Sequence, residues 1–307
     1  MKRVTIICPV YNEQQSIPLF YKKVREIMDS LKGRYSTNLL FMNNASTDES
    51  LPIIEGLMKA DPDVYCITLS INRGYQISVE FGLKNAVGDL FMVVDVDCED
   101  PPEMVNVFLE EHESGFDIVY GERVDREESA ALKKARKLFY RLTRALSDEN
   151  FLLDMAEFCL LTSEVRDAIA KDETSYPFIR ASIGRIGFKI KGIPYRRHKR
   201  IAGKTNYNLY RMFHFAIAGI LSSSTLPLRF LVYIFPIIFL INIAELICYL
   251  MTSELARVFE ALFLNSLYMA FGTAFFCIYL ARTYKNGLGR PNAHLIKRFS
   301  RLQSANS

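Results

Sequence analysis

Short apolar runs alternate with amphipathic stretches over residues 1 to 125 of the chain. Turn-forming residues bound the runs that are predicted strands: Val4–Val10, Asn38–Met42, Val64–Ser70, Leu90–Val96 and Phe116–Tyr120. Apolar residues spaced three and four apart predict a helix that is capped by Ser16 and ends at Gly33. A second helix is predicted to open with the capping box Ser46–Glu49. This alternation indicates an α/β fold with a mostly parallel sheet.

The pattern becomes more mixed after residue 130. Leu132–Leu146 is predicted to be a basic helix, and a strand around Phe158–Leu161 is followed by another helix. Residues 208–224 combine aromatic and basic side chains on a helical period. That combination is typical of a helix that lies in a membrane interface.

Two apolar stretches near the C-terminus, Leu228–Met251 and Val258–Leu280, are each long enough to cross a hydrocarbon core of about 30 Å. Glu245 in the first would cost roughly 3 kcal/mol at mid-bilayer, but the surrounding Leu, Ile, Phe and Val residues, at about −0.4 kcal/mol each, outweigh it. The short connection Thr252–Arg257 predicts a helical hairpin. Basic residues follow the second stretch, so the hairpin ends are expected in the cytoplasm.

Composition supports a membrane partner over a nucleic acid. The 307 residues are 50% hydrophobic and 23% charged, and the formal net charge is only +4. The mean hydropathy is positive, which is unusual for a fully soluble protein. The 6 cysteines form no CxxC pattern, so neither a zinc site nor a disulfide framework is indicated. The first apolar run is too short for a signal peptide and is interpreted as a strand.

Polar residues follow the first four predicted strands: Tyr11–Glu13, Asn43–Asn44, Asn72–Gly74 and an acidic cluster between Asp95 and Glu103. Ligands of open parallel sheets bind beyond the carboxyl ends of the strands, where loops converge on helix N-termini. Polar residues at one sheet edge therefore favour a binding cleft over unrelated solvated loops.

The acidic cluster suggests a bound cation. Two carboxylates 4 Å apart repel by about 4 kcal/mol at an effective dielectric near 20. Asp95, Asp97 and Glu99 alternate along an extended segment and can share one face. Hard oxygen ligands favour Mg²⁺ or Mn²⁺, which bridge to phosphate oxygens and so indicate a diphosphate substrate. GxGxxG and GxxxxGK[ST] motifs are missing, which argues against dinucleotide redox chemistry and P-loop hydrolysis. A solvated acidic loop is the alternative.

Several motifs together resemble one family. They are CPVYNEQQSI (8–17), MNNASTDES (42–50), NRGYQISVEFGL (72–83), DVDCEDPPE (95–103), GER (121–123), the stretch 132–161 and RIAGKTNYNL (200–209). With two apolar stretches after them, they resemble the polyprenyl-phosphate glycosyltransferases, inverting family 2 nucleotide-sugar enzymes with a GT-A fold. Bacterial undecaprenyl-phosphate glucosyl- and aminoarabinosyl-transferases and dolichyl-phosphate mannose synthase are members.

The resemblance implies a role for each matching residue. The metal, Mg²⁺ or Mn²⁺, would be held by Asp95, Asp97 and Glu99. Substrate-binding residues at the nucleotide end would be Pro9, Tyr11, Glu13, Asn44 and Asn72. The acceptor phosphate would meet Arg123 and Lys134, and the donor diphosphate would meet Arg200 and Lys204. Acids beside the reacting centre would be Asp154 and Glu157, so the expected catalytic group is Asp97, Asp154, Glu157 and Arg123. The chain departs from the family where Asn44-Ala45-Ser46 replaces the common Asp-Gly-Ser.

The resemblance also implies an organisation and a location. A GT-A domain is expected over residues 1–205, a juxtamembrane amphipathic helix over 206–226, two transmembrane helices over 227–282 and a basic cytoplasmic tail over 283–307. The terminal position of the last ten residues separately predicts that they are frayed. The expected location is the bacterial cytoplasmic membrane, with both termini and the catalytic domain on the cytoplasmic side. A homo-oligomer, a tetramer by the resemblance, is expected, and no nucleic-acid partner.

The expected activity is transfer of a sugar from a nucleotide donor to polyprenyl phosphate. A lipid phosphate is already anionic and attacks without losing a proton, so cations matter more than a strong base. One alternative is a glycolipid or polysaccharide hydroxyl acceptor, for which Asp154 or Glu157 must act as a base. Another is a catalytically silent scaffold. Processive polysaccharide synthesis is disfavoured because its Gln-x-x-Arg-Trp motif cannot exist in a chain with 0 Trp.

Overall fold

The computed structural model describes residues 1–124, 155–202 and 224–304. Several sequence predictions lie outside these ranges: the basic helix 132–146, nearly all of the juxtamembrane helix 206–226, and the side chains of Lys134, Asp154 and Lys204.

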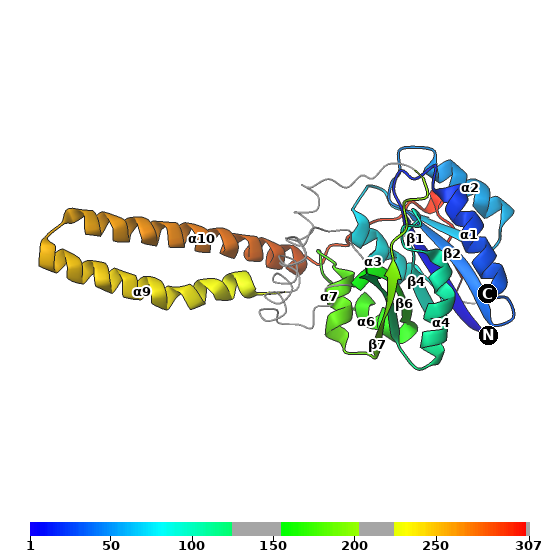
Figure 1. Ribbon diagram of the computed structural model, residues 1–307. Helices are drawn as coiled ribbons and strands as arrows, with labels where there is room; N and C mark the ends of the chain where they lie inside the picture. The colour runs from blue at the N-terminus through cyan, green and yellow to red at the C-terminus, as the bar shows by residue number, and fades with distance from the viewer. Residues whose placement is uncertain (125–154, 203–223, 305–307) are drawn as a thin grey trace.

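A seven-stranded sheet forms the centre of the N-terminal domain (Figure 1). Its strands are β1 (Lys2–Val10), β2 (Tyr35–Asn43), β3 (Val64–Thr68), β4 (Leu90–Val93), β5 (Ile118–Val124), β6 (Met155–Thr162) and β7 (Ile190–Arg196). The strand order is β3-β2-β1-β4-β6-β5-β7. β6 runs antiparallel to both of its neighbours, and every other pair is parallel. The predicted mostly parallel sheet is therefore confirmed.

Helices cover both faces of this sheet. They are α1 (Ile17–Ser30), α2 (Ser50–Ala60), α3 (Tyr75–Asn85), α4 (Val105–Glu113), α6 (Ser163–Ala170) and α7 (Ile179–Ile186), with a short 3₁₀ turn η1 (Pro102–Met104) before α4. Successive β1 residues enter opposite cores: Ile6 packs with α1, α2 and α4, whereas Ile7 packs with α3, α6 and α7. Both faces are buried, which is why the central strands are continuous apolar runs.

The structure corrects two local predictions and adds one strand. β4 ends at Val93 rather than Val96, so the acids that follow lie in a loop rather than on a strand. α2 begins at Ser50 without a side-chain cap, and Ser46 instead accepts a hydrogen bond from the Asn12 amide at 3.1 Å. The capping-box prediction was wrong. β7 was not predicted, because it is largely half-exposed and contains a glycine and a proline.

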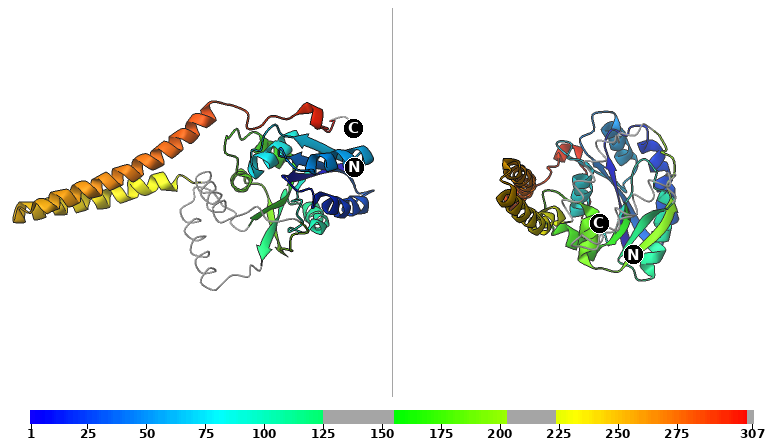
Figure 2. Two further views of the ribbon diagram at one scale, coloured as in Figure 1. Left: turned by 90° about the horizontal axis from the view of Figure 1, so that it is seen from above. Right: turned by 60° about the vertical axis from the view of Figure 1, so that its left-hand side comes forward.

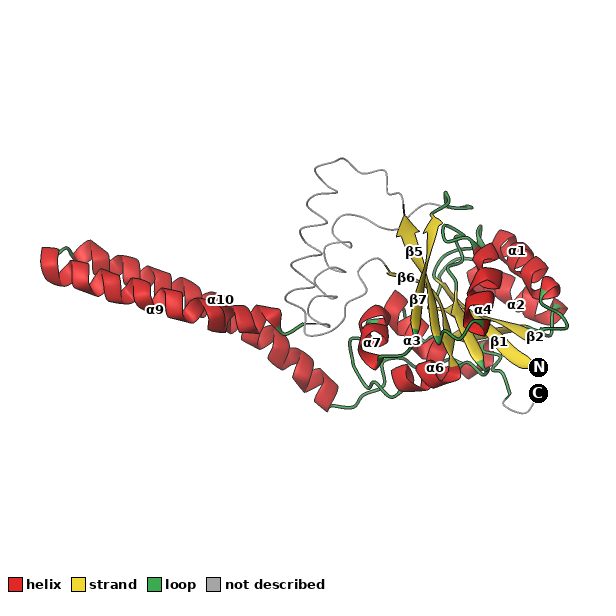
Figure 3. Cartoon of the chain, turned by 60° about the horizontal axis from the view of Figure 1, so that its bottom comes forward, coloured by secondary structure: helices red, strands yellow, loops and turns green. Residues whose placement is uncertain are grey.

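Two long helices, α9 (Leu226–Thr252) and α10 (Leu255–Gly287), lie side by side and extend away from the sheet domain (Figures 1 and 3). Both are long and apolar enough to cross a membrane. The side-chain amides of Asn242 and Asn265 donate to each other, at 3.0 and 2.8 Å. Tyr268 donates to the Leu231 carbonyl at 3.0 Å. These polar contacts fix the register of the hairpin.

The chain after α10 returns to the sheet and runs along the free edge of β3, near the N-terminus (Figure 2). The Ile296 amide donates to the Thr68 carbonyl, and the Arg301 amide donates to the Cys66 carbonyl, each at 2.8 Å. A short 3₁₀ turn, η2 (Lys297–Phe299), lies between these bonds. The prediction of a frayed C-terminus is wrong for residues 298–304, which are ordered against the domain.

Candidate functional site

The loops after β1 and β2 are joined by polar contacts. The Asn12 carboxamide oxygen accepts from the Thr47 amide at 2.8 Å, and Asn12 adopts a left-handed conformation with φ of 56°. The Glu13 amide donates to the Ser50 hydroxyl at 2.8 Å. Asn tolerates the left-handed region better than most residues, so it suits this turn. The Glu13 carboxylate is thereby fixed at the carboxyl edge of the sheet.

The loop after β3 is joined to the loop after β2 through Asn44, which is buried just beyond the end of β2. Its amide nitrogen donates to the Asn72 side-chain oxygen at 3.0 Å, and its own oxygen accepts from the Arg73 amide at 2.9 Å. Ala45 follows with φ of 56°, a conformation that favours glycine. The predicted convergence of the loops after β1, β2 and β3 at one edge is confirmed.

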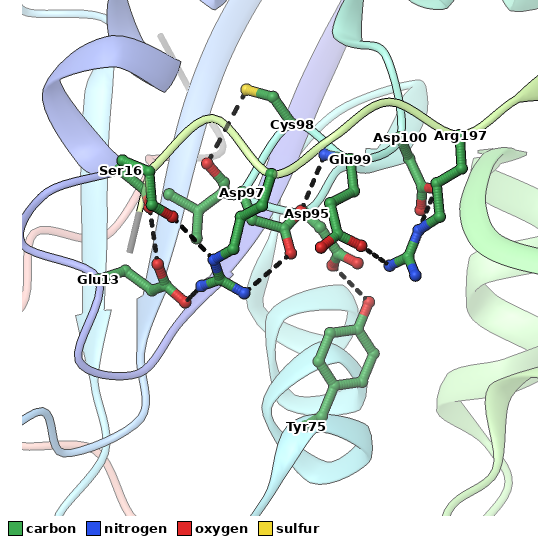
Figure 4. A network of polar contacts seen from close by, with 12 residues as sticks. Glu13, Ser16, Tyr75, Asp95, Asp97, Cys98, Glu99, Asp100 and Arg197 are labelled. Atoms are coloured by element: carbon green, nitrogen blue, oxygen red, sulfur yellow. Dashed lines mark hydrogen bonds and ion pairs between the residues drawn. The ribbon is translucent and has the colours of Figure 1, made fainter. Parts of the chain in front are cut away.

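Asp95 is the most unusual acid of the loop after β4. Tyr75 donates to one of its carboxylate oxygens at 2.7 Å (Figure 4). Among the described residues, no basic side chain forms an ion pair with it. Removal from water, followed by repulsion from Asp100 and Asp97, raises the pKa of Asp95 to about 8. An acid in this setting gains from a nearby cation.

The other loop acids face arginines of the segment after β7. Arg200 contacts the Asp97 carboxylate at 3.3 Å and also pairs with Glu13. Arg197 contacts the Glu99 carboxylate at 2.5 Å (Figure 4). Backbone bonds hold the two segments together, because the amides at positions 198 and 201 donate to the carbonyls at 99 and 97, at 2.8 and 2.9 Å. Even so, burial and Asp97 raise the pKa of Glu99.

Asp100 closes the acidic cluster and is 1% exposed. Arg123 donates to one of its oxygens at 2.8 Å, and the Tyr195 hydroxyl donates to the other at 2.5 Å. Arg123, on β5, is thus held by an acid of the cluster. The sequence analysis included Asp100 in the acidic cluster but predicted no role for it. Charge alone does not distinguish an acid that holds an arginine from an acid that binds a metal.

Glu157, on β6, is buried and lies in a second polar group. The Gln76 side-chain amide donates to its carboxylate, and Arg180 lies 3.4 Å from the same oxygen. Gln76 also accepts from the Ile179 amide at 3.1 Å. Neither Gln76 nor Arg180 was among the predicted site residues. A buried carboxylate requires partners, but the sequence does not say which residues supply them.

The structure places the remaining predicted residues around these groups. Pro9 lies in β1 beside Met42 of β2, and Tyr11 is 39% exposed just after β1. Glu13, Asp97 and Arg200 are brought into direct contact. Glu157 belongs to the separate group with Gln76 and Arg180.

The sequence of the sheet domain decides the family. Residues 5–168 match the profile of glycosyl transferase family 2. The chain belongs to glycosyl transferase family 2. The protein is therefore a glycosyltransferase, and its mixed sheet with helices on both faces agrees with the GT-A fold expected from the motifs.

Three relatives match most of the chain, and one of these matches covers nearly all of it. An uncharacterized glycosyltransferase, YkcC, of Bacillus subtilis (strain 168) is 34% identical over 75% of this chain and 71% of its own. A prophage bactoprenol glucosyl transferase homolog of Escherichia coli (strain K12) is 30% identical over 96% of this chain and 99% of its own. A bactoprenol glucosyl transferase of Shigella phage SfV is 33% identical over 76% of this chain and 75% of its own.

Solved structures with a similar chain path share little sequence. Mannosyl-3-phosphoglycerate synthase from Rubrobacter xylanophilus is 14% identical, with a TM-score of 0.45 over 71% of this chain and 72% of its own. Glucosyl-3-phosphoglycerate synthase from Mycobacterium tuberculosis is 15% identical, with a TM-score of 0.44 over 69% of this chain and 75% of its own.

Family 2 enzymes of this fold commonly use a divalent metal. Within residues 1–124, 155–202 and 224–304, no three His, Cys, Asp or Glu side chains are arranged to hold an ion. Asp97 and Glu99 contact arginines instead. The oxygen atoms nevertheless suit Mg²⁺, which usually takes only one or two carboxylates together with phosphate oxygens and water. Asp95 and Asp97 fit that smaller set.

A separate cavity of about 320 Å³ lies between residues 172–185, which include most of α7, and the end of α10. Tyr176 and Arg282 are among its lining residues, and the Arg282 guanidinium lies 4.5 Å from the Tyr176 ring centre. The Ser175 amide donates to the Asn286 side chain at 2.9 Å. None of the acids that follow β4 lines this cavity. These contacts join the hairpin to the sheet domain.

Proposed function

We propose that the protein transfers a sugar from a nucleotide sugar to polyprenyl phosphate, with inversion at the sugar, while anchored in a membrane. The observation that carries the proposal is the match to a bactoprenol glucosyl transferase homolog over 96% of this chain, because it includes both the acidic site and the apolar hairpin. The bactoprenol glucosyl transferase of Shigella phage SfV supports the same acceptor class. An apolar hairpin beside the catalytic domain suits a lipid acceptor.

The donor is proposed to bind across the loops after β1, β2 and β3. Pro9, Tyr11, Glu13, Asn44 and Asn72 form the nucleotide end of this site. Asn44 and Asn72 hydrogen-bond each other, so they act as one surface. Loops held together in this way need little rearrangement to bind a ligand.

Asp95 and Asp97 are the proposed ligands of Mg²⁺ or Mn²⁺, and Glu99 can join them when Arg197 leaves its carboxylate. When bound, the ion neutralises charge on the donor diphosphate. Arg200 now contacts Asp97 and Glu13, and the arriving diphosphate offers it a stronger partner. Arg200 and Lys204 are therefore proposed to cover the donor.

The reaction needs little proton transfer. A phosphate oxygen of the lipid attacks the anomeric carbon as the bond from that carbon to the diphosphate oxygen breaks, and the electron pair leaves with the nucleoside diphosphate. Arg123 and Lys134 are proposed to bring the acceptor phosphate close, and Asp154 and Glu157 to lie beside the reacting carbon. The Glu157 carboxylate is already held by Gln76 and Arg180, which favours an orienting role over that of a base.

The proposal extends to location. Residues 227–282 are proposed to span the bacterial cytoplasmic membrane twice, with residues 1–205, the juxtamembrane helix 206–226 and the tail 283–307 on the cytoplasmic side. Basic residues after the second helix favour that side. A homo-oligomer, expected as a tetramer, stays a prediction.

Membranes that contain the full-length protein should be incubated with undecaprenyl phosphate, Mg²⁺ or Mn²⁺ and a panel of labelled nucleotide sugars. We expect one label to enter the lipid fraction, and we expect chelation or Asp97→Asn to abolish the transfer. Glu110→Gln, in the exposed part of α4, is the matched control and should remain active. Full transfer by Asp97→Asn would contradict the proposal.

A hydroxyl of a glycolipid is the second candidate acceptor, and it requires Asp154 or Glu157 to act as a base. Such an acceptor must lose a proton, so its transfer rate should fall steeply below the pKa of the catalytic base. At saturating Mn²⁺, where metal binding at Asp95 no longer varies with pH, a nearly flat rate between pH 6 and 8, expected to within about threefold, favours the phosphate acceptor.

A further inference from the structure

We infer that the first turn of α3 positions two acids of the site: Tyr75 orients Asp95, and Gln76 orients Glu157. The inference rests on the proposed function and deepens it, because it links the metal-binding acid to the acid beside the reacting carbon. Tyr75 and Gln76 are positioning residues, since each acts through another side chain.

The sequence before α3 places these two side chains. Gly74 has φ of 84°, and its amide donates to the Asn72 side chain at 2.8 Å, so the loop ends in a tight turn. α3 then begins at Tyr75. Consecutive helical residues point about 100° apart around the axis. Two neighbours in sequence can therefore reach two different acids.

Tyr75 fixes one oxygen of Asp95. Its hydroxyl donates to that oxygen at 2.7 Å, while the ring packs against the apolar cluster on the sheet face that α3, α6 and α7 cover. A rigid phenol holds its partner in one orientation and leaves the second carboxylate oxygen available. Among the described residues, Asp95 has no other side-chain hydrogen bond. Loss of the phenol hydroxyl would leave this carboxylate without its orienting contact.

Gln76 connects three elements. Its amide nitrogen donates to Glu157 of β6, and its oxygen accepts from the backbone amide of Ile179 at the start of α7. Because nitrogen and oxygen each have a fixed partner, the amide cannot rotate without losing both bonds. Arg180 supplies a positive charge 3.4 Å from the same carboxylate oxygen. Glu157 is thus tied to the helix that begins beside Asp95.

Removal of a residue that hydrogen-bonds to a metal ligand typically weakens metal binding by about 10- to 100-fold. Tyr75→Phe in the full-length protein should therefore weaken Mn²⁺ binding, measured by calorimetry without nucleotide, by about tenfold. Tyr21→Phe is the matched control, because Tyr21 donates to Asp61 at 2.8 Å through an equivalent phenol. The control should bind Mn²⁺ as the wild type does. Equal Mn²⁺ affinities for Tyr75→Phe and Tyr21→Phe would overturn the inference for Asp95.

Gln76→Met keeps a similar volume and removes both hydrogen bonds. We expect kcat for sugar transfer to fall by about tenfold, with Mn²⁺ affinity and donor KM within about twofold of wild type. Gln303→Met is the matched control: Gln303 also bridges two groups, accepting from the Val87 amide at 2.7 Å and donating to Thr5 at 3.1 Å.

The two variants separate the inference from the proposed function. If the wild type binds Mn²⁺ and transfers sugar but Gln76→Met behaves as Gln303→Met does, the assignment of Gln76 is wrong. If the wild type neither binds Mn²⁺ nor transfers any sugar, the proposed function itself fails. A fall in melting temperature shared by a variant and its control reports lost packing, whereas a change in Mn²⁺ affinity or kcat confined to the site variant reports positioning.

Discussion

At the scale of single residues, the site is an arrangement of acids whose charges are compensated unequally. Asp97, Glu99 and Asp100 each contact an arginine, whereas Asp95 contacts only a phenol hydroxyl among the described side chains. Arginine side chains therefore neutralise Asp97, Glu99 and Asp100, whereas Asp95 is left to interact with a bound cation. Binding of metal and donor must rearrange these ion pairs.

Arg200→Ala should change metal and donor binding in opposite directions. Removing the guanidinium frees Asp97 from a partly exposed ion pair of about 1 kcal/mol, so Mn²⁺ alone should bind up to about fivefold more tightly. The donor with Mn²⁺ should bind at least about tenfold more weakly, because a charge-assisted contact to the diphosphate is lost. Calorimetric titration with Mn²⁺ alone, and with the donor in the presence of Mn²⁺, measures both changes in affinity. Arg34→Ala, at an exposed position, is the control. Weaker binding of Mn²⁺ alone would show that Arg200 does not compete with the ion.

Ala45→Gly should leave the melting temperature unchanged or raise it slightly. A left-handed alanine costs about 1 to 2 kcal/mol, and its relief offsets the greater freedom of glycine in the unfolded chain. Ala168→Gly, inside α6, is the control and should lower stability by about 1 kcal/mol. Thermal unfolding of both variants in detergent measures the difference. An equal loss in both would mean that position 45 carries no strain.

At the scale of elements, apolar runs were enough to find β1 to β4, because strands buried on both faces are uninterrupted apolar stretches. β7, the edge strand opposite β3, was not predicted, because Gly192 and Pro194 interrupt its apolar pattern and only Tyr195 is buried along its length. The C-terminal segment also escaped detection, since it binds β3 largely through backbone groups that leave no sequence pattern.

The candidate site was predictable to a similar degree. Charge and spacing selected Asp95, Asp97 and Glu99 as candidate metal ligands, and family motifs selected Glu157 as a candidate acid; both stay predictions. Tyr75 and Gln76 were not predicted to contact these acids, because a tyrosine or glutamine in a helix has the same pattern whether it packs, faces solvent or holds an acid. Their role depends on the distance between elements, which only the fold supplies.

Deletion of residues 292–307 should destabilise the sheet domain. The segment satisfies backbone groups of β3 and buries Ala293, so its removal exposes an unprotected sheet edge. We expect a lower melting temperature and more aggregation in light scattering. Deletion of residues 305–307 alone is the control and should behave as the wild type does. An unchanged melting temperature for the longer deletion would contradict the structural role of this segment.

The asparagine pair in the hairpin allows a double-mutant cycle. Asn242→Leu leaves the Asn265 amide without its partner between apolar helices, and hydrogen bonds of this kind average about 0.6 kcal/mol in membrane proteins. The single variant should lower the stability of the hairpin, and Asn242→Leu with Asn265→Leu should recover part of the loss. Unfolding in detergent checks this. Additive losses would show that the two amides do not interact.

At the scale of the whole molecule, the hairpin and the sheet domain are joined at several points. The end of α10 contacts Ser175 and Tyr176, and the following chain returns along the β3 edge of the sheet. A domain held at more than one place keeps a defined orientation toward the helices. This arrangement suits an enzyme whose two substrates come from water and from the membrane.

A comparison of two acceptors distinguishes transfer to a phosphate from transfer to a hydroxyl. Full-length protein in lipid, supplied with Mn²⁺ and the nucleotide sugar that it uses, should be given undecaprenyl phosphate or the matching alcohol, undecaprenol. We expect label in the lipid fraction with the phosphate and none above background with the alcohol. Equal labelling of undecaprenol, or transfer to a glycolipid hydroxyl while undecaprenyl phosphate stays unlabelled, would contradict it.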